Sequence, residues 1–189
     1  MKRLLEAAKQ IYGEDSDILT AILVMRYAGL RISDTAMLRS EYLNGDVLKV
    51  PTIKSGSVVT VPIPRFLVDR LNATETVDGY YFVRGSRRMR TQTEIMRKKF
   101  NECAKLAGLE KATPHRLRHT YAVSALIAGI STDVLSKILG HSSPASGGLA
   151  LSHEKSGLEI KPQSNLGPGP RRLRARTSSG KMLNSSNRS

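Results

Sequence analysis

Residues 113–122, with the sequence TPHRLRHTYA, combine the residue types that chemistry at a phosphodiester requires. A threonine followed by a proline is a typical helix start, so we expect a helix to begin here. On that helix His115, Arg118 and His119 are spaced i, i+3 and i+4 and share one face. A proton-transfer group beside a fixed cation could act on a phosphodiester. The alternative is a solvated basic helix that contacts only a DNA backbone, and this segment alone leaves both interpretations open.

Three further residues are candidates for the same site. Arg31 lies between an apolar segment and a cap signal, where the backbone would hold its guanidinium ready for two phosphate oxygens. Lys54 lies in an expected hairpin turn and could reach a DNA groove or donate a proton, and His141 follows Gly140 at an expected helix end. Each has an ordinary alternative: an ion-paired arginine, a solvated lysine and a capping histidine. The order Arg, Lys, His-x-x-Arg, His is what makes the set specific.

The elements that would position these residues are a series of helices and one β-hairpin. Apolar periodicity and cap signals predict the helices, and alternating valines on either side of a turn at residues 54–56 predict the hairpin. Ser33 would cap a short helix, and Thr91-x-x-Glu94 would form the capping box of a longer one. The expected helices cover 4–11, 18–27, 33–38, 65–71, 91–108, 114–129 and 132–139, and the expected strands cover 47–51, 58–63 and 80–83.

The character of the chain changes near residue 143. Residues 1–143 carry the periodic apolar segments and are long enough to bury a core. Of the 46 residues from 144 to 189, 19 are Gly, Pro or Ser and none is aromatic. Their apolar residues have no sustained period, and Arg171–Arg176 is a basic cluster. We therefore expect residues 144–189 to form a disordered basic tail, either frameshifted or divergent.

The charge balance points to a polyanionic partner. The 30 Lys and Arg residues against 16 acidic residues give a formal net charge of +14, and nucleic acid is the commonest partner of such a protein. The single cysteine, Cys103, excludes an internal disulfide and fits a reducing cytoplasm. No apolar run is long enough for a membrane span, and neither zinc-ligand spacing nor a phosphate-binding loop occurs. We expect a cytoplasmic protein with no membrane partner, no metal and no small-molecule cofactor.

Taken together, these motifs resemble the catalytic domain of the tyrosine recombinases, or phage integrases. The segment from Gly29 to Asp34 is similar to the family's first arginine box, and the turn around Lys54 is similar to its hairpin lysine segment. The segment HRLRHTYA at residues 115–122 is similar to the His-x-x-Arg box, and LGHSS at residues 139–143 is similar to the segment of the last active-site histidine. The resemblance covers roughly residues 1–143.

The resemblance implies an α+β domain, mainly helical with a small antiparallel sheet, that breaks and rejoins double-stranded DNA in DNA integration and site-specific recombination. In the family a tyrosine attacks the scissile phosphate, with no metal and no cofactor. Arg31 and Arg118 would hold the two non-bridging oxygens, Lys54 would protonate the leaving oxygen, and His115 would take the proton of the tyrosine.

The resemblance also implies supporting roles, and a homo-oligomer on DNA. His141 would donate a hydrogen bond to the phosphate. Asp34 would hold the phosphate-binding residues in place without contacting the phosphate itself. We interpret Arg116, His119 and Tyr121 as structural or DNA-backbone residues. Both active-site arginines would face an open groove.

The sequence departs from the family in two respects. No tyrosine follows Tyr121, and Ala150 or Leu151 stands where the family has its nucleophile. The helical domain that precedes the catalytic domain in family members is also missing from the sequence, so half of the clamp around DNA would be absent. Two hypotheses follow. In the first, the chain is a recombinase catalytic domain that is inactive because it lacks the tyrosine, unless a partner supplies one in trans. In the second, it is a truncated, non-catalytic DNA-binding remnant of a mobile-element integrase.

Overall fold

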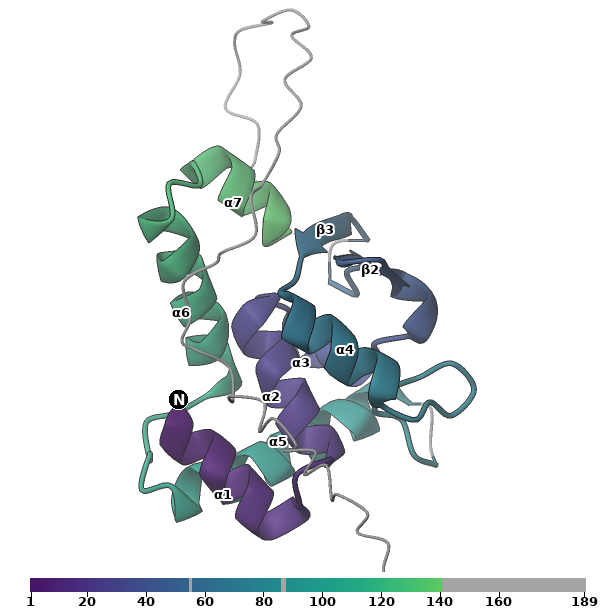
Figure 1. The fold of residues 1–189 in the computed structure, drawn as a ribbon, viewed down its shortest axis with the longest axis vertical. Coiled ribbons are helices and arrows are strands. Elements are labelled where there is room, and N and C mark those ends of the chain that lie inside the picture. Colours follow the sequence, from purple (N-terminus) through teal and green to yellow (C-terminus); the bar gives the residue numbers. More distant parts are fainter. Residues whose placement is uncertain (55, 86–87, 141–189) are drawn as a thin grey trace, which may run out of the picture.

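The structure, a computed structural model, describes residues 1–54, 56–85 and 88–140. Helices dominate this part of the chain and accompany a small antiparallel sheet, as expected (Figure 1). The expected tail at 144–189 and the candidate residue His141 lie outside the described residues. The helices are α1 Lys2–Tyr12, α2 Asp17–Tyr27, α3 Ile32–Ala36, α4 Arg65–Ala73, α5 Met89–Leu106, α6 Pro114–Ile127 and α7 Thr132–Ile138, with a 3₁₀ turn at Ser40–Tyr42.

Helix α2 is the centre of the core. All of its residues from Ile18 to Met25 are buried, because its sequence is apolar on every side rather than along one stripe. Helices α1, α3, α4, α5 and α6 all pack against it. This arrangement fixes α3 and α6, the two helices that carry the candidate arginines, relative to each other.

The sheet consists of β1 (Leu43–Asn44), β2 (Val47–Pro51) and β3 (Val58–Pro62), in the order β1-β2-β3. In the predicted hairpin, Leu48 pairs with Val61 and Val50 with Val59, and all four side chains are buried. This alternation holds the register, because a slip by one residue would turn the apolar face towards solvent. The two-residue strand β1 was not expected, since so short a strand has no sequence period.

Helices α6 and α7 begin as the sequence predicts. The Thr113 hydroxyl accepts a hydrogen bond from the Arg116 backbone N–H at 3.3 Å, and Ser131 caps α7 in the same way through Val134. Helix α6 packs on α2 and on α7, and α7 packs in turn on β3 (Figure 1). The end of α7 therefore lies next to the β2–β3 hairpin.

Two cap predictions are wrong. Helix α3 begins at Ile32 with Arg31 as its N-cap, so Ser33 lies inside the helix. Helix α5 begins at Met89, so Thr91 is also inside, and neither helix has a side-chain cap hydrogen bond. In both cases packing of the first turn overrides the local signal, as the burial of Gln92 in α5 shows.

The strand expected at residues 80–83 is not formed. Tyr80 makes isolated bridges with Arg39 and Val77, and the Tyr81 backbone N–H donates to the Leu38 carbonyl oxygen at 3.1 Å, but these contacts do not extend into a ladder. Tyr81 and Phe82 are buried, so the segment is apolar because it packs on the core rather than because it extends the sheet. Periodicity alone does not distinguish these two causes.

The packing of α6 gives a direct test of the core. Leu117 belongs to the main core cluster, whereas Ile127 on the same helix is 82% exposed. We expect Leu117→Ala to lower the free energy of unfolding by about 2–5 kcal/mol because it leaves a cavity. The matched variant Ile127→Ala should change it by less than about 0.5 kcal/mol. Urea denaturation of both variants measures the difference, and equal losses would contradict this packing of α6.

Candidate active site

Arg118 is the most constrained residue of the candidate site. It lies in the middle of α6 and is 7% exposed. Its Nη1 donates a hydrogen bond to the Gly29 carbonyl oxygen at 2.7 Å, and its Nη2 donates to the Leu139 carbonyl oxygen. A buried guanidinium requires such acceptors, because a buried charge without partners is strongly unfavourable. The Arg118 side chain is therefore held between the turn after α2 and the end of α7.

Arg31 reaches the same region from another element. It is the N-cap of α3, so its backbone position is fixed by the start of that helix. Its Nη2 donates to the Gly140 carbonyl oxygen at 3.4 Å. Arg31 and Arg118 are thus bound to the carbonyls of two successive residues, Gly140 and Leu139.

The end of α7 is suited to hold two cations. The last carbonyls of a helix have no partners within the helix and carry the negative end of its dipole, so both effects favour guanidinium groups there. Gly140 also allows the close approach of α7 to the hairpin. It has φ +59°, and a Cβ at this position would lie 3.0 Å from Val59 Cγ2, which any larger residue would have to displace.

Asp34 connects the first arginine to the hairpin. Its side chain is buried, and its Oδ1 accepts a hydrogen bond from the Ile53 backbone N–H at 3.1 Å. Its Oδ2 lies 3.9 Å from Arg31 Nη1, too far for a hydrogen bond, and neither atom has a hydrogen-bond partner among the described residues. Ile53 immediately precedes Lys54 in the turn between β2 and β3. The hydrogen bond from Ile53 to Asp34 therefore places the start of this turn next to α3.

Burial mainly determines the electrostatics of the arginine cluster, which consists of Arg31 and Arg118 with the neighbouring Asp34. Desolvation raises the pKa of Asp34, although the Ile53 N–H and the positive charges of Arg31 and Arg118 act in the opposite direction. Burial, and then the charge of Arg31, lowers the pKa of Arg118 to about 10, with Asp34 opposing the shift. Arg118 therefore stays protonated at neutral pH. Two guanidinium groups against one carboxyl leave an excess of positive charge, which favours an anion.

The remaining candidate residues near this cluster are more exposed to solvent than the two arginines. Lys54 is exposed in the turn between β2 and β3, and His115 is exposed one turn before Arg118 on α6. Arg116 and His119 are also exposed, and the Arg116 Nη1 donates to the Lys111 carbonyl oxygen at 3.2 Å. Within the described part of the chain, no hydrogen bond or ion pair joins His115 to either arginine.

One expectation about these residues needs correction. Arg118 does not face an open groove, because its side chain is buried and bound to two backbone carbonyls. His115, Arg118 and His119 keep their helical spacing on α6, but the two histidines are exposed and the arginine between them is buried. Helical spacing places residues on one side of a helix but does not say which of them another element covers.

Sequence reasoning missed the backbone acceptors of the site. The carbonyls of Gly29, Leu139 and Gly140 hold the arginines, yet the sequence marks these residues only as helix ends. The contacts join residues far apart in the chain, and no local pattern reports them.

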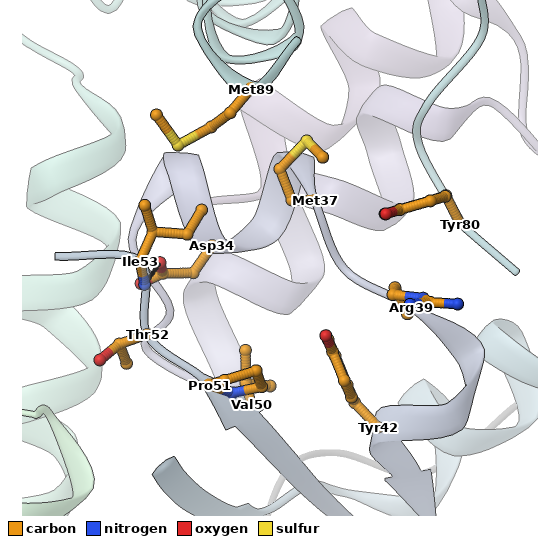
Figure 2. A pocket seen from close by; sticks show the side chains of 10 residues that line it. All are labelled: Asp34, Met37, Arg39, Tyr42, Val50, Pro51, Thr52, Ile53, Tyr80 and Met89. Atoms are coloured by element: carbon orange, nitrogen blue, oxygen red, sulfur yellow. Dashed lines mark hydrogen bonds between the residues drawn. The ribbon is translucent and has the colours of Figure 1, made fainter. Parts of the chain in front are cut away.

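A cavity of about 380 Å³ lies on the other side of Asp34. Figure 2 shows Asp34 and Ile53 at one edge of it, with the aromatic residues Tyr42 and Tyr80 towards the other. Neither Arg31 nor Arg118 lines this cavity. It is therefore separate from the arginine cluster and is not the place where an anion would meet both guanidinium groups.

Residues 1–54, 56–85 and 88–140 contain neither a cluster of metal ligands nor a membrane-spanning helix. No group of three or more His, Cys, Asp and Glu side chains is arranged there to hold a metal ion. No helix in these ranges has both the length and the apolar character needed to cross a membrane.

The chain is similar to recombinases and integrases in both sequence and structure. It is 32% identical over 130 residues to tyrosine recombinase XerA of Pyrococcus furiosus, covering 65% of this chain and 45% of the relative. The XerA of Thermococcus kodakarensis is 29% identical over 150 residues, covering 75% of this chain and 52% of the relative.

Solved structures agree with the sequence comparison. A crystal structure of XerA recombinase superposes with a TM-score of 0.61 at 28% identity, covering 75% of this chain and 54% of the other. The catalytic domain of bacteriophage HP1 integrase gives a TM-score of 0.59 at 25% identity, covering 75% of this chain and 77% of the other.

The chain spans about half the length of the curated relatives it matches. The Phage integrase family matches it over residues 1–147, which include the helices and the sheet of the described residues and both arginines of the cluster. The chain therefore belongs to the phage integrase family and contains a tyrosine recombinase catalytic domain.

Proposed function

We propose that this chain acts in site-specific DNA recombination, with double-stranded DNA as its partner. The observation that supports this most is the pairing of Arg31 and Arg118 at the end of α7. A guanidinium has five N–H donors, and the two backbone carbonyls accept from only two of those of Arg118. The buried Arg118 and the half-buried Arg31 can therefore still bind the two non-bridging oxygens of a single phosphodiester. Their charges would then stabilise the negative charge that builds up when a nucleophile attacks the phosphorus.

The exposed residues around this cluster suit proton transfer. We assign Lys54 as the proton donor to the leaving oxygen and His115 as the acceptor of the proton of the nucleophile. Both are exposed and can move towards a bound phosphate, whereas the arginines are fixed. His141 would add a hydrogen bond to the phosphate, and Arg116 and His119 would contact the DNA backbone.

The nucleophile is the missing part of this proposal. No tyrosine occurs in the sequence after Tyr121, and the ring of Tyr121 is packed against the Gly29 turn. We therefore propose that the chain binds and polarises the phosphate but does not attack it, unless a partner chain supplies a tyrosine. The same feature favours the second candidate, a DNA-binding remnant of a mobile-element integrase.

DNA binding through the cluster is testable by its dependence on salt. If about six phosphate contacts form, the slope of log affinity against log salt concentration is roughly −5. We expect Arg31→Ala to weaken binding of a short duplex about tenfold and to reduce this slope by about 1. Fluorescence anisotropy over a salt series measures both quantities with two duplexes of unrelated sequence.

Arg3→Ala is the matched control for this measurement. Arg3 is exposed on α1, a helix that packs on α2 and α5 and lies below α7 and the strands β2 and β3 in Figure 1. The control should bind like the unchanged chain. If both variants lose affinity equally, binding is a general charge effect and the arginine cluster is not the phosphate site. A preference above about 100-fold for one duplex would contradict largely sequence-independent binding.

The missing nucleophile gives a second test. On a nicked suicide substrate, we expect no covalent protein–DNA adduct from this chain or from Ala150→Tyr, because a nucleophile must be delivered by an ordered element. A chimera that joins residues 1–143 to the C-terminal segment of an active relative should form the adduct, and the chimera with Arg31→Ala should not. A denaturing gel with end-labelled DNA separates these outcomes.

Two results would overturn this assignment. A protease-sensitive shifted band from the unchanged chain would show that one of its own tyrosines attacks. A chimera with Arg31→Ala that reacts as fast as the parent chimera would show that the arginine cluster does not stabilise the reaction.

A further inference from the structure

The Tyr121 ring lies directly on the Gly29 turn. Gly29 has φ +64°, and a Cβ built on it would lie 2.4 Å from Tyr121 Cδ1 and 2.9 Å from Cε1. Real Cβ atoms do not approach a ring this closely, so only glycine permits the contact. The Gly29 carbonyl is one of the two acceptors that hold Arg118.

Tyr121 also packs near Leu139, the second residue whose carbonyl holds Arg118. Its side chain packs on the small apolar cluster of Ala125, Leu135 and Leu139, and the Leu139 carbonyl accepts from Arg118 Nη2. Tyr121 follows Arg118 by one helical turn, so both side chains leave α6 on the same side. Tyr121 thus contacts the Gly29 turn through its ring and packs against the cluster to which Leu139 belongs, so it lies between the two segments whose carbonyls bind the Arg118 guanidinium.

The Tyr121 hydroxyl forms no hydrogen bond with any of the residues described in the structure, and the contact with Gly29 is made by the ring. Burial raises the pKa of the hydroxyl, and the nearby charge of Arg118 acts in the opposite direction. A role that depends on the ring rather than the hydroxyl predicts different behaviour for phenylalanine and leucine at this position.

We propose that Tyr121 is a positioning residue. Its ring holds the Gly29 turn and the end of α7 at the separation at which their two carbonyls bind the Arg118 guanidinium. Its importance for DNA binding rests on the proposed function, in which Arg118 contacts the phosphate. Its effect on Arg118 itself does not depend on that function.

The test compares Tyr121→Leu, Tyr121→Phe and Phe100→Leu in the full chain. Phe100 is fully buried on α5, a helix that packs on α1, α2 and α3, so Phe100→Leu removes an aromatic ring from the core on a different helix from Arg118 and Tyr121. The first measurement is the rate at which the Arg118 guanidinium hydrogens exchange with water, followed by NMR without DNA. Arg118→Lys identifies the Arg118 signals by their loss.

We expect about tenfold faster exchange in Tyr121→Leu, because a charged hydrogen bond held by the ring is loosened. Affinity for a short duplex should also fall about tenfold. Tyr121→Phe should stay within about twofold of the unchanged chain in both measurements. Phe100→Leu should lower Tm and leave both unchanged.

The contrary results are distinct. If Tyr121→Leu lowers Tm but leaves Arg118 exchange unchanged, Tyr121 only fills space and the proposal is wrong. If Tyr121→Phe is as damaging as Tyr121→Leu, the hydroxyl acts and the proposal is also wrong.

If Tyr121→Leu does not fold, Gly29→Ala perturbs the same contact from the other side and should accelerate the exchange of the Arg118 guanidinium hydrogens to a similar extent. Normal exchange in Gly29→Ala would overturn the proposal. If Arg118→Lys binds DNA normally, the proposed function fails while the exchange measurement still decides the role of Tyr121.

Discussion

The burial of the Arg118 guanidinium is the constraint on which the rest of this structure depends. A buried cation needs acceptors, and the chain provides them as two backbone carbonyls from segments on either side of α6. The turn after α2, the middle of α6 and the end of α7 must therefore stay together. Helix α2 supports this arrangement, because it is buried on all sides and packs against α6, on which α7 packs in turn.

The second arginine and the hairpin are attached to this centre by weaker links. Arg31 shares the end of α7 through the Gly140 carbonyl, and Asp34 connects α3 to the backbone of Ile53. The buried carboxyl, whose pKa burial raises, only partly compensates for the two guanidinium groups. The outcome is a buried, positively charged cluster with the exposed side chains of Lys54 and His115 on neighbouring turns, which suits a site that holds an anion and moves protons around it.

Much of this structure could be predicted from particular residues. Apolar periodicity located α2, the valine alternation located the β2–β3 hairpin, and Thr113 marked the start of α6. The failed predictions share one cause. Ser33 and Thr91 are good cap residues, and 80–83 is a good strand sequence, but packing against the core decides what each segment does. The site shows the same division: side chains such as Arg31 are visible in the sequence, whereas carbonyl acceptors and the burial of Arg118 arise from contacts distant in the chain.

The central claim is that Arg31 and Arg118 bind one phosphodiester. A crystal structure of the full chain with a short DNA duplex tests it most directly. The account predicts one phosphate with its two non-bridging oxygens within hydrogen-bonding distance of the two guanidinium groups, and with the Arg118 contacts to Gly29 and Leu139 retained. A complex in which DNA phosphates contact exposed residues such as Arg116 and His119, while both guanidinium groups of the cluster contact no phosphate, would contradict it.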